Sequence, residues 1–314
     1  MKYANVPVSR IDIPPDGELK FAKTVDKKII RYAVWPKGDK GFVLFLNGRN
    51  EYIEKYNNTY KKFQEMGFGV ITLDWRSQGF SERPSWNNNL GYVEDFLHYQ
   101  YDIEAVLEDS SFSSRSGTRI LVGHSTGACI GLRTLLERSY NFDSAIFLSP
   151  LWGWGDKVKS RFVRKFFLAS SYVITKIGLG HISFGPQPKQ PYVLTQSTGT
   201  NVLTSDFSQF KRLQDIASKE PGLSTGAPSF SWIASAQREI ENLQKTSGLD
   251  IPVLVAVGSE DNLISQDAAK LLCKKNPSWI FKFFTNARHE LLIEKEEVVE
   301  KLWYQIETFL SANN

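Results

Sequence analysis

The chain has 314 residues, 41% hydrophobic and 23% charged, which is enough for one large α/β domain or two small ones with a substantial core. The net charge of +4 gives no strong signal for nucleic-acid binding, and the two cysteines, Cys129 and Cys273, provide neither a disulfide framework nor metal-ligand spacing. The first residues lack the apolar segment of a signal peptide, and no apolar run approaches the roughly 18 residues of a membrane span, so we expect a cytoplasmic protein, with a peripheral membrane role left open.

Strands and helices alternate along the first part of the chain. A polar N-terminal segment leads toward an edge strand, and a strand is predicted from Ile29 to Trp35. Short apolar runs, typical of strands buried on both faces, predict further strands at 42–46, 69–74, 120–122, 145–148, 252–257 and 279–284. Helices are predicted at 53–66, 91–109, 128–137, 266–274 and 296–310. This order predicts a doubly wound, mostly parallel sheet of the α/β class.

The alternation is interrupted after Ser149-Pro150. Residues 151–245 are rich in aromatic, proline and basic residues and show no clear order of strands and helices. We therefore predict a mainly helical module at 151–245, inserted between two parts of an α/β core, residues 1–150 and 246–314.

One pentapeptide, Gly123-His124-Ser125-Thr126-Gly127, joins a predicted strand to a predicted helix. This is the G-x-S-x-G pattern in the setting that a nucleophilic serine requires: strand, sharp turn, helix. Glycines on both sides allow strand and helix to approach, and the helix N-terminus points its free N–H groups toward the serine. The pattern also occurs by chance, but its context favours Ser125 as a nucleophile.

A serine hydroxyl needs a neighbouring base, and the chain offers four histidines. His98 lies within a predicted surface helix, His124 should point away from the adjacent serine, and His181 lies in the inserted module. His289 follows the carboxyl end of a predicted strand, where open α/β sheets gather their active sites. It also completes the order serine, acid, histidine, so we predict His289 as the base.

The acid that orients the base should lie between the serine and the histidine. Asp261 follows the strand at 252–257 and occupies the expected edge of the sheet. Glu260 is kept as the substitute, and Asp267 fits better as a residue that caps the following helix.

The oxyanion that forms during attack needs backbone N–H donors fixed in advance. The sequence predicts one donor at Thr126, directly after the serine, and one at Arg49 in the loop Asn47-Gly48-Arg49. The alternative for this loop is an ordinary connection between strand and helix.

These motifs together resemble the α/β-hydrolase superfamily, and within it the monoacylglycerol-lipase-like serine hydrolases, most closely the bacterial lysophospholipases of that branch. The resemblance covers residues 25–312, and its motifs are 47–51, 74–81, 91–96, 123–127, 148–150, 258–261 and His289. Two positions depart from the family pattern: Asn47, where the family usually has histidine, and Ser77, where it usually has glycine. Glu51 matches a family glutamate that holds the oxyanion loop.

The resemblance implies a cap over the active site, at residues 151–245, that selects the substrate. Trp152, Trp154 and Trp232 are then candidates for contact with an acyl chain, the alternative for the segment around Trp232 being ordinary packing of the cap on the core. The basic and aromatic stretch 157–168 is typical of a helix on an anionic lipid surface, and equally of a solvated helix face.

The sequence therefore predicts a serine hydrolase that cleaves carboxylic esters of fatty acids without a metal or an organic cofactor. By resemblance the substrate is a lysophospholipid, and a monoacylglycerol or simple carboxylester is the closest rival. A prolyl aminopeptidase-like enzyme would need an acidic cluster for the free amine, and the predicted cap is basic. A non-catalytic binding protein would typically have lost a member of the triad. No nucleic-acid partner is expected, because no phosphate-cradling or base-stacking motif accompanies the basic cluster.

Overall fold

A computed structural model describes the chain except for residues 1–12, 14–15, 138–139, 156–160, 187–189 and 314, and it gives no side-chain placement for 113 and 161–164. Eight strands form one sheet in the order β1-β2-β4-β3-β5-β6-β7-β8. Their bounds are Glu18–Lys23 (β1), Ile29–Trp35 (β2), Gly41–Leu46 (β3), Phe68–Leu73 (β4), Thr118–His124 (β5), Ser144–Leu148 (β6), Val253–Gly258 (β7) and Trp279–Phe284 (β8).

The sheet is parallel from β4 to β8, and only β1 and β2 run antiparallel to their neighbours. This confirms the predicted α/β class and places β1 at the edge. The strands lie within two residues of their predicted bounds, because continuous apolar runs such as Val43 to Leu46 are buried on both faces.

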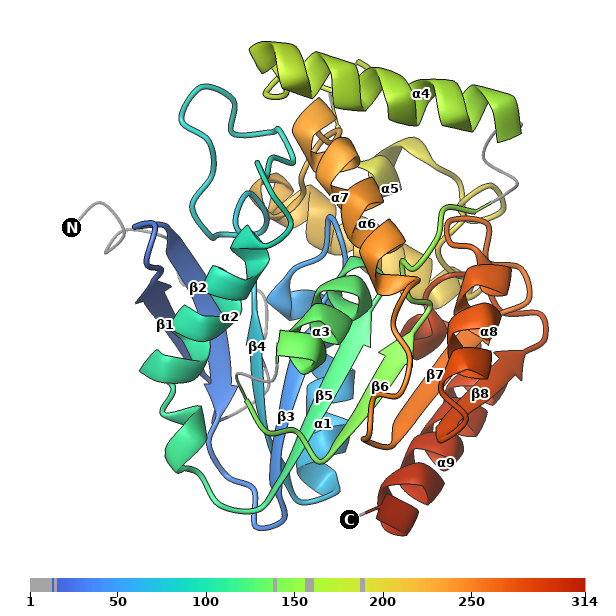
Figure 1. Cartoon of the computed structure of the whole chain (residues 1–314). Coiled ribbons are helices and arrows are strands. Elements are labelled where there is room, and N and C mark those ends of the chain that lie inside the picture. Colours follow the sequence, from blue (N-terminus) through green and yellow to red (C-terminus); the bar gives the residue numbers. More distant parts are fainter. Residues whose placement is uncertain (1–12, 14–15, 138–139, 156–160, 187–189, 314) are drawn as a thin grey trace.

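Helices cover both faces of the sheet (Figure 1). One face packs on α1 (Asn57–Glu65) and α9 (Glu296–Asn313), and the other on α2 (His98–Asp109), α3 (Thr126–Glu137) and α8 (Gln266–Lys275). Alternate residues of β3 divide between the two cores: Val43 and Phe45 face the first pair of helices, and Leu44 and Leu46 face the other three.

Between β6 and β7 the described elements are helical. They are α4 (Arg161–Ile174), a π-helical turn at Thr175–Leu179, α5 (Tyr192–Thr195), α6 (Phe207–Lys219), a short turn at Pro221–Leu223 and α7 (Phe230–Leu243). In Figure 1 these helices lie beyond the carboxyl ends of the parallel strands, with α4 outermost and packed on α7.

The helix predicted at 91–109 begins only at His98, so this prediction was wrong by seven residues. Of the apolar side chains in the part that is not helical, Val93 and Phe96 are buried, at 1% and 3% exposed, whereas Leu97 is 45% exposed. Their backbone, however, is held in turns by contacts from elsewhere: the hydroxyl of Ser231 donates to the carbonyl of Val93 (2.8 Å), and Gly91 bridges to Pro228.

Candidate active site

Ser125 occupies the sharp turn between β5 and α3. Its φ of 52° lies in the left-handed region, which non-glycine residues seldom adopt and which is typical of strained functional positions. A Cβ on Gly123 would lie 2.7 Å from the Cα of Ala128, and one on Gly127 would lie 2.1 Å from the carbonyl oxygen of Leu46. Both positions therefore require glycine, for the reason that the sequence pattern indicated: side chains there would push strand and helix apart.

Asp261 and His289 meet at the carboxyl end of the sheet, although 28 residues separate them in the chain. The Nδ1 of His289 lies 2.7 Å from Oδ2 of Asp261, and both side chains are nearly fully buried. The other oxygen of Asp261 accepts backbone N–H groups of Leu263 (2.9 Å) and Ile264 (3.3 Å). Burial would raise the pKa of Asp261, but His289 and these hydrogen bonds lower it, so the carboxylate stays ionised.

His289 also lies beside the serine turn. Its ring centroid is 4.8 Å from that of His124, the residue directly before Ser125, and its carbonyl accepts a hydrogen bond from Nε2 of His124 (3.2 Å). In the described part of the chain no hydrogen bond joins the hydroxyl of Ser125 to His289; such bonds are often long in enzymes without substrate.

The other candidates for base and acid lie elsewhere. His181 is exposed, and His98 stacks on Tyr101 at the start of α2. The side chain of Glu260 is half exposed and faces Arg288 at 4.0 Å rather than a histidine. Asp267 is exposed in the first turn of α8, whose N-cap is Ser265.

The loop 47–51 has the arrangement expected of an oxyanion loop. The N–H of Gly48 donates to the carboxylate of Glu51, and the N–H of Asn50 donates to the side chain of Gln78 (2.5 Å). Between them, the N–H of Arg49 forms no hydrogen bond within the described structure. Thr126 is the first residue of α3, where a backbone N–H has no partner within the helix. The backbone N–H groups at the two predicted positions, Arg49 and Thr126, are thus without a hydrogen-bond acceptor in the described structure.

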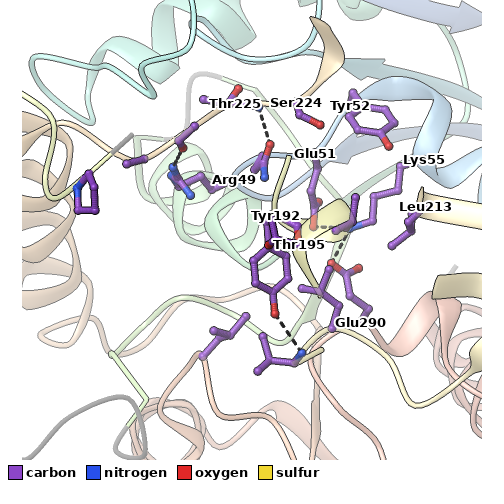
Figure 2. Close-up of a pocket in the computed structure, with 18 residues that line it drawn as sticks. Arg49, Glu51, Tyr52, Lys55, Tyr192, Thr195, Leu213, Ser224, Thr225 and Glu290 are labelled. Atoms are coloured by element: carbon purple, nitrogen blue, oxygen red, sulfur yellow. Dashed lines mark hydrogen bonds and ion pairs between the residues drawn. The ribbon is translucent and has the colours of Figure 1, made fainter. Parts of the chain in front are cut away.

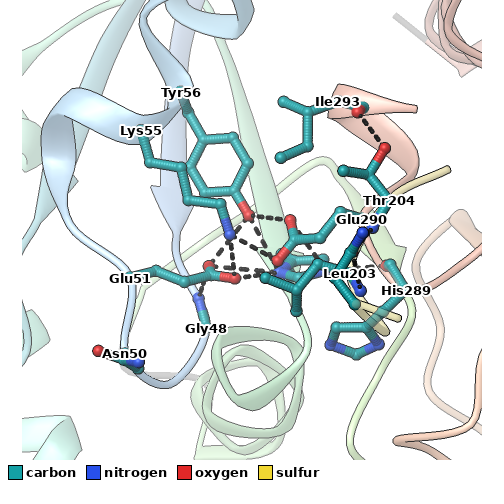
Figure 3. A network of polar contacts seen from close by, with 12 residues as sticks. Gly48, Asn50, Glu51, Lys55, Tyr56, Leu203, Thr204, His289, Glu290 and Ile293 are labelled. Atoms are coloured by element: carbon teal, nitrogen blue, oxygen red, sulfur yellow. Dashed lines mark hydrogen bonds and ion pairs between the residues drawn. The ribbon is translucent and has the colours of Figure 1, made fainter. Parts of the chain in front are cut away.

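A buried polar network joins this loop to the serine turn and to the histidine loop (Figure 3). The ammonium of Lys55 lies 2.9 Å from Glu51 and also contacts Glu290. The hydroxyl of Tyr56 lies 3.0 Å from Glu51, 2.9 Å from Glu290 and 3.1 Å from Nδ1 of His124. Since Glu51 neighbours the oxyanion loop, His124 precedes Ser125 and Glu290 follows His289, the network fixes three loops relative to one another.

Both ring nitrogens of His124 face acceptors, the carboxylate of Glu51 (3.0 Å) and the carbonyl of His289, so the ring is held doubly protonated. Burial would lower the pKa of His124, but Glu51 and Glu290 outweigh it and raise the pKa to about 9. Glu51, His124 and Glu290 lie close enough to ligate a metal ion. Lys55 already supplies the positive charge between the two carboxylates, which argues against such a role.

The sequence predicted the part of Glu51 in this network but not Lys55, Tyr56 or Glu290. Two signals were available: Lys55 follows Glu51 by four residues, the spacing of an ion pair on one helical face, and Glu290 adjoins the predicted base.

The three predicted cap tryptophans differ in accessibility. Trp152 is fully buried and packs on Phe147 (5.3 Å between ring centroids) and Trp279 (5.9 Å). The prediction that Trp152 contacts the substrate is therefore wrong, because its side chain has no surface open to a ligand. Trp232 is 4% exposed and its indole N–H donates to Tyr99 (3.0 Å), which fits packing of the cap on the core. Trp154 is partly exposed and donates to Gln237 (2.7 Å).

A cavity of about 430 Å³ lies between loops of the sheet and the helical segment that joins β6 to β7 (Figure 2). Its wall contains Arg49 of the predicted oxyanion loop, Leu263 close to Asp261 in the chain, and Glu290 next to His289. The segment between β6 and β7 contributes residues that come before and after α6 in the chain, among them Tyr192, Val202 and Thr225. The cavity wall thus contains residues that neighbour Asp261 and His289 in the chain, but Ser125, Asp261 and His289 are not themselves among the described wall residues.

Comparison with known proteins agrees with this geometry. A family model described as "Serine aminopeptidase, S33" matches residues 37–296. A protein named "Probable lysophospholipase L2" from Haemophilus influenzae is 24% identical over 294 residues, which cover 92% of this chain and 90% of the relative. "Monoglyceride lipase" from Rattus norvegicus is 22% identical over 302 residues, covering 95% and 91%.

Among solved structures, a soluble variant of monoglyceride lipase from Saccharomyces cerevisiae superposes with a TM-score of 0.74 at 18% identity, covering 98% of each chain. This likeness shows the fold. With the family match over most of its length, the chain is an α/β-hydrolase and belongs to the serine aminopeptidase S33 family.

Proposed function

We propose that the protein hydrolyses the carboxylic ester of a lysophospholipid, with Ser125 as nucleophile, His289 as base and Asp261 as the residue that orients His289. The observation that carries the proposal is the buried hydrogen bond between Asp261 and His289 beside the strained turn of Ser125. Because Nδ1 of His289 is bound to Asp261, Nε2 is the nitrogen left to take a proton.

In the first half of the reaction the oxygen of Ser125 attacks the ester carbonyl while its proton passes to His289. The N–H groups of Thr126 and Arg49 bind the negative oxygen, and the alcohol leaves with the proton from His289. In the second half a water molecule, deprotonated by His289, releases the fatty acid and restores Ser125.

Two relatives favour a lipid ester over a peptide. The Haemophilus influenzae and rat relatives are named for lysophospholipids and monoglycerides. An aminopeptidase needs a free carboxylate for the amine of its substrate. The described carboxylates in the cavity wall, Glu51 and Glu290, are both bound by Lys55, so neither is available.

The test compares hydrolysis of a lysophospholipid, a monoacylglycerol of the same acyl chain and an aminoacyl amide by the purified protein. We expect the lysophospholipid to give the highest kcat/KM, and no turnover of the amide. Exclusive cleavage of the amide would overturn the ester assignment, and a monoacylglycerol preference would replace the substrate with its rival.

We also propose that residues 151–245 act as a cap that rests on lipid surfaces. No described helix is both long and apolar enough to cross a bilayer. The predicted basic stretch 157–168 lies partly outside the described residues, but α4 and the turn after it expose Phe166 (70%), Val173 (56%) and Ile177 (66%). Spacings of seven and four residues bring these side chains to one face of a helix.

Replacing Phe166 and Ile177 by aspartate is expected to lower co-sedimentation with anionic phospholipid vesicles about tenfold or more, because both apolar contact and charge attraction are weakened. Tyr304→Asp on α9, equally exposed at 66%, is the matched control and should leave binding unchanged. Equal vesicle binding by all three proteins would remove the lipid-surface role.

A further inference from the structure

Arg49 lies in the cavity wall, and among the described residues its guanidinium lacks the carboxylate that normally pairs with an arginine shielded from solvent. Its Nη2 donates to the carbonyl of Gly226 in the cap, and its charge lies 5.5 Å from the ring of Trp232. Its Nε is shielded from solvent, and within the described structure neither Nε nor Nη1 forms a hydrogen bond. No described carboxylate pairs with it, and burial lowers the pKa of Arg49 to about 10.

Arg83 shows how this chain satisfies an arginine that also lacks a carboxylate. Like Arg49, it connects a core loop to the cap. It donates through all three nitrogens to the backbone carbonyls of Gly79, Asn88, Gly222, Leu223 and Ser224. The N–H groups of the Arg83 guanidinium thus have acceptors within the protein, whereas most N–H groups of the Arg49 guanidinium have none in the described structure. A shielded donor without an acceptor is costly, which points to an acceptor that arrives from outside.

The other ionisable groups near the cavity balance one another. Glu51 and Glu290 carry two negative charges, and Lys55 and the doubly protonated His124 carry two positive charges, all within one hydrogen-bonded network. In Figure 2 Arg49 lies apart from Glu51, Lys55 and Glu290. Its positive charge is therefore the one in the described wall that no neighbouring group neutralises, and the cavity presents it to a ligand.

We propose that the side chain of Arg49 binds the phosphate of the substrate headgroup and so selects phosphate-bearing esters, an inference that rests on the proposed function. A planar guanidinium donates paired hydrogen bonds to phosphate oxygens, and the shielded site strengthens them. A monoacylglycerol offers a neutral hydroxyl in place of the phosphate and cannot neutralise Arg49. The same residue would then favour a lysophospholipid over its closest rival.

The position of Arg49 in the chain suits this role. Its backbone N–H is a predicted oxyanion donor, and its side chain extends from that point along the cavity wall. In a lysophospholipid the glycerol unit separates the ester from the phosphate. One residue can therefore hold the scissile carbonyl through its backbone and the phosphate through its side chain, which aligns the ester with Ser125.

Arg49→Met tests the proposal, because it removes the guanidinium and keeps the backbone N–H. We expect kcat/KM for a lysophosphatidylcholine to fall about 10- to 100-fold, mainly through KM, and kcat/KM for the monoacylglycerol of the same chain to fall about tenfold less than that. Arg49→Lys, which keeps the charge, should recover part of the loss. Arg83→Met is the matched control and should affect both substrates alike. Equal losses for both substrates with Arg49→Met would overturn the phosphate role.

A binding experiment separates this proposal from the proposed function. Glycerol 3-phosphate and glycerophosphocholine should inhibit hydrolysis of a monoacylglycerol competitively in the wild type, whereas glycerol should not. The inhibition should weaken at least tenfold in Arg49→Met. If the wild type cleaves no lysophospholipid but shows this Arg49-dependent inhibition, the anion site stands and the substrate assignment fails. Inhibition that is the same in both proteins would remove the anion site.

Discussion

Ser125→Ala is expected to lower kcat for ester hydrolysis by about 10⁵- to 10⁶-fold, because no covalent intermediate can form without the hydroxyl. The fold should persist. Ser125 lies at the surface of a turn whose shape depends on Gly123 and Gly127, and its hydroxyl has no partner in the described structure. Hydrolysis of a lysophospholipid and thermal unfolding should be measured on the same preparation.

Ser149→Ala is the matched control for this variant. Ser149 directly follows the neighbouring strand β6, also has a positive φ (43°), and carries a buried hydroxyl that forms no hydrogen bond within the described structure. The control should retain hydrolysis within a few-fold. Full activity in Ser125→Ala, or an equal loss in both variants, would show that Ser125 is not the nucleophile.

Lys55→Met is expected to lower the free energy of unfolding by about 3–5 kcal/mol, since it leaves two buried carboxylates without their cation. Lys55 is 4% exposed, and methionine has a similar volume, so lost packing contributes little. Urea unfolding followed by tryptophan fluorescence measures the change. Lys62→Met on the neighbouring helix α1 removes a partly exposed ammonium that faces Glu307 at 3.3 Å, and should change stability by less than about 1 kcal/mol.

The deficit of Lys55→Met should depend on pH in a defined direction. In the wild type burial would raise the pKa of Glu51, but His124 and Lys55 outweigh it and hold that pKa well below 4.5. This contribution is therefore complete above about pH 4.5 and is lost as the pH falls through the lower folded value. Without Lys55 the folded Glu51 carboxylate binds a proton more readily, so the difference in stability between variant and wild type should shrink from pH 8 to pH 5. A deficit independent of pH would show that packing rather than charge is responsible.

Adding Glu290→Gln to Lys55→Met should recover part of the lost stability, because one of the two unpaired charges is removed. A double variant as unstable as the sum of the single variants would contradict direct coupling between Lys55 and Glu290.

Much of the fold follows from local patterns. A strand buried on both faces must be apolar throughout, so runs such as Val253 to Val257 identify the sheet without knowledge of its neighbours. The candidate site follows from the fold: parallel strands bring their carboxyl ends to one edge, so Ser125, Asp261 and His289 were expected together from their places after β5, β7 and β8. The left-handed φ of Ser77 (67°) agrees with the glycine that the family resemblance implies at this position.

The remaining features depend on contacts between distant segments. The amphipathic pattern of 91–109 is consistent with burial of Val93. It does not indicate the contacts with Ser231 and Pro228 that keep the backbone there from forming a helix. Trp152 lies next to the predicted cap boundary, and nothing in its neighbourhood indicates that its ring turns into the core beside Trp279. The pairing of Lys55 with Glu290 likewise has no local signature beyond the charges themselves.

That pairing has a consequence for the order of folding. Glu290 follows Lys55 by 235 residues, so the two sides of the network meet only after that whole stretch has been synthesised. A nascent chain that ends before β8 lacks Glu290. Glu51 is then the one carboxylate of the network beside the two positive charges of Lys55 and His124. Until the segment that carries Glu290 is in place, the positive charges of Lys55 and His124, beside the loop 47–51 and the serine turn, are not fully neutralised. The segment that carries Glu290, which the ribosome produces long after Lys55 and His124, is thus the part that completes this network.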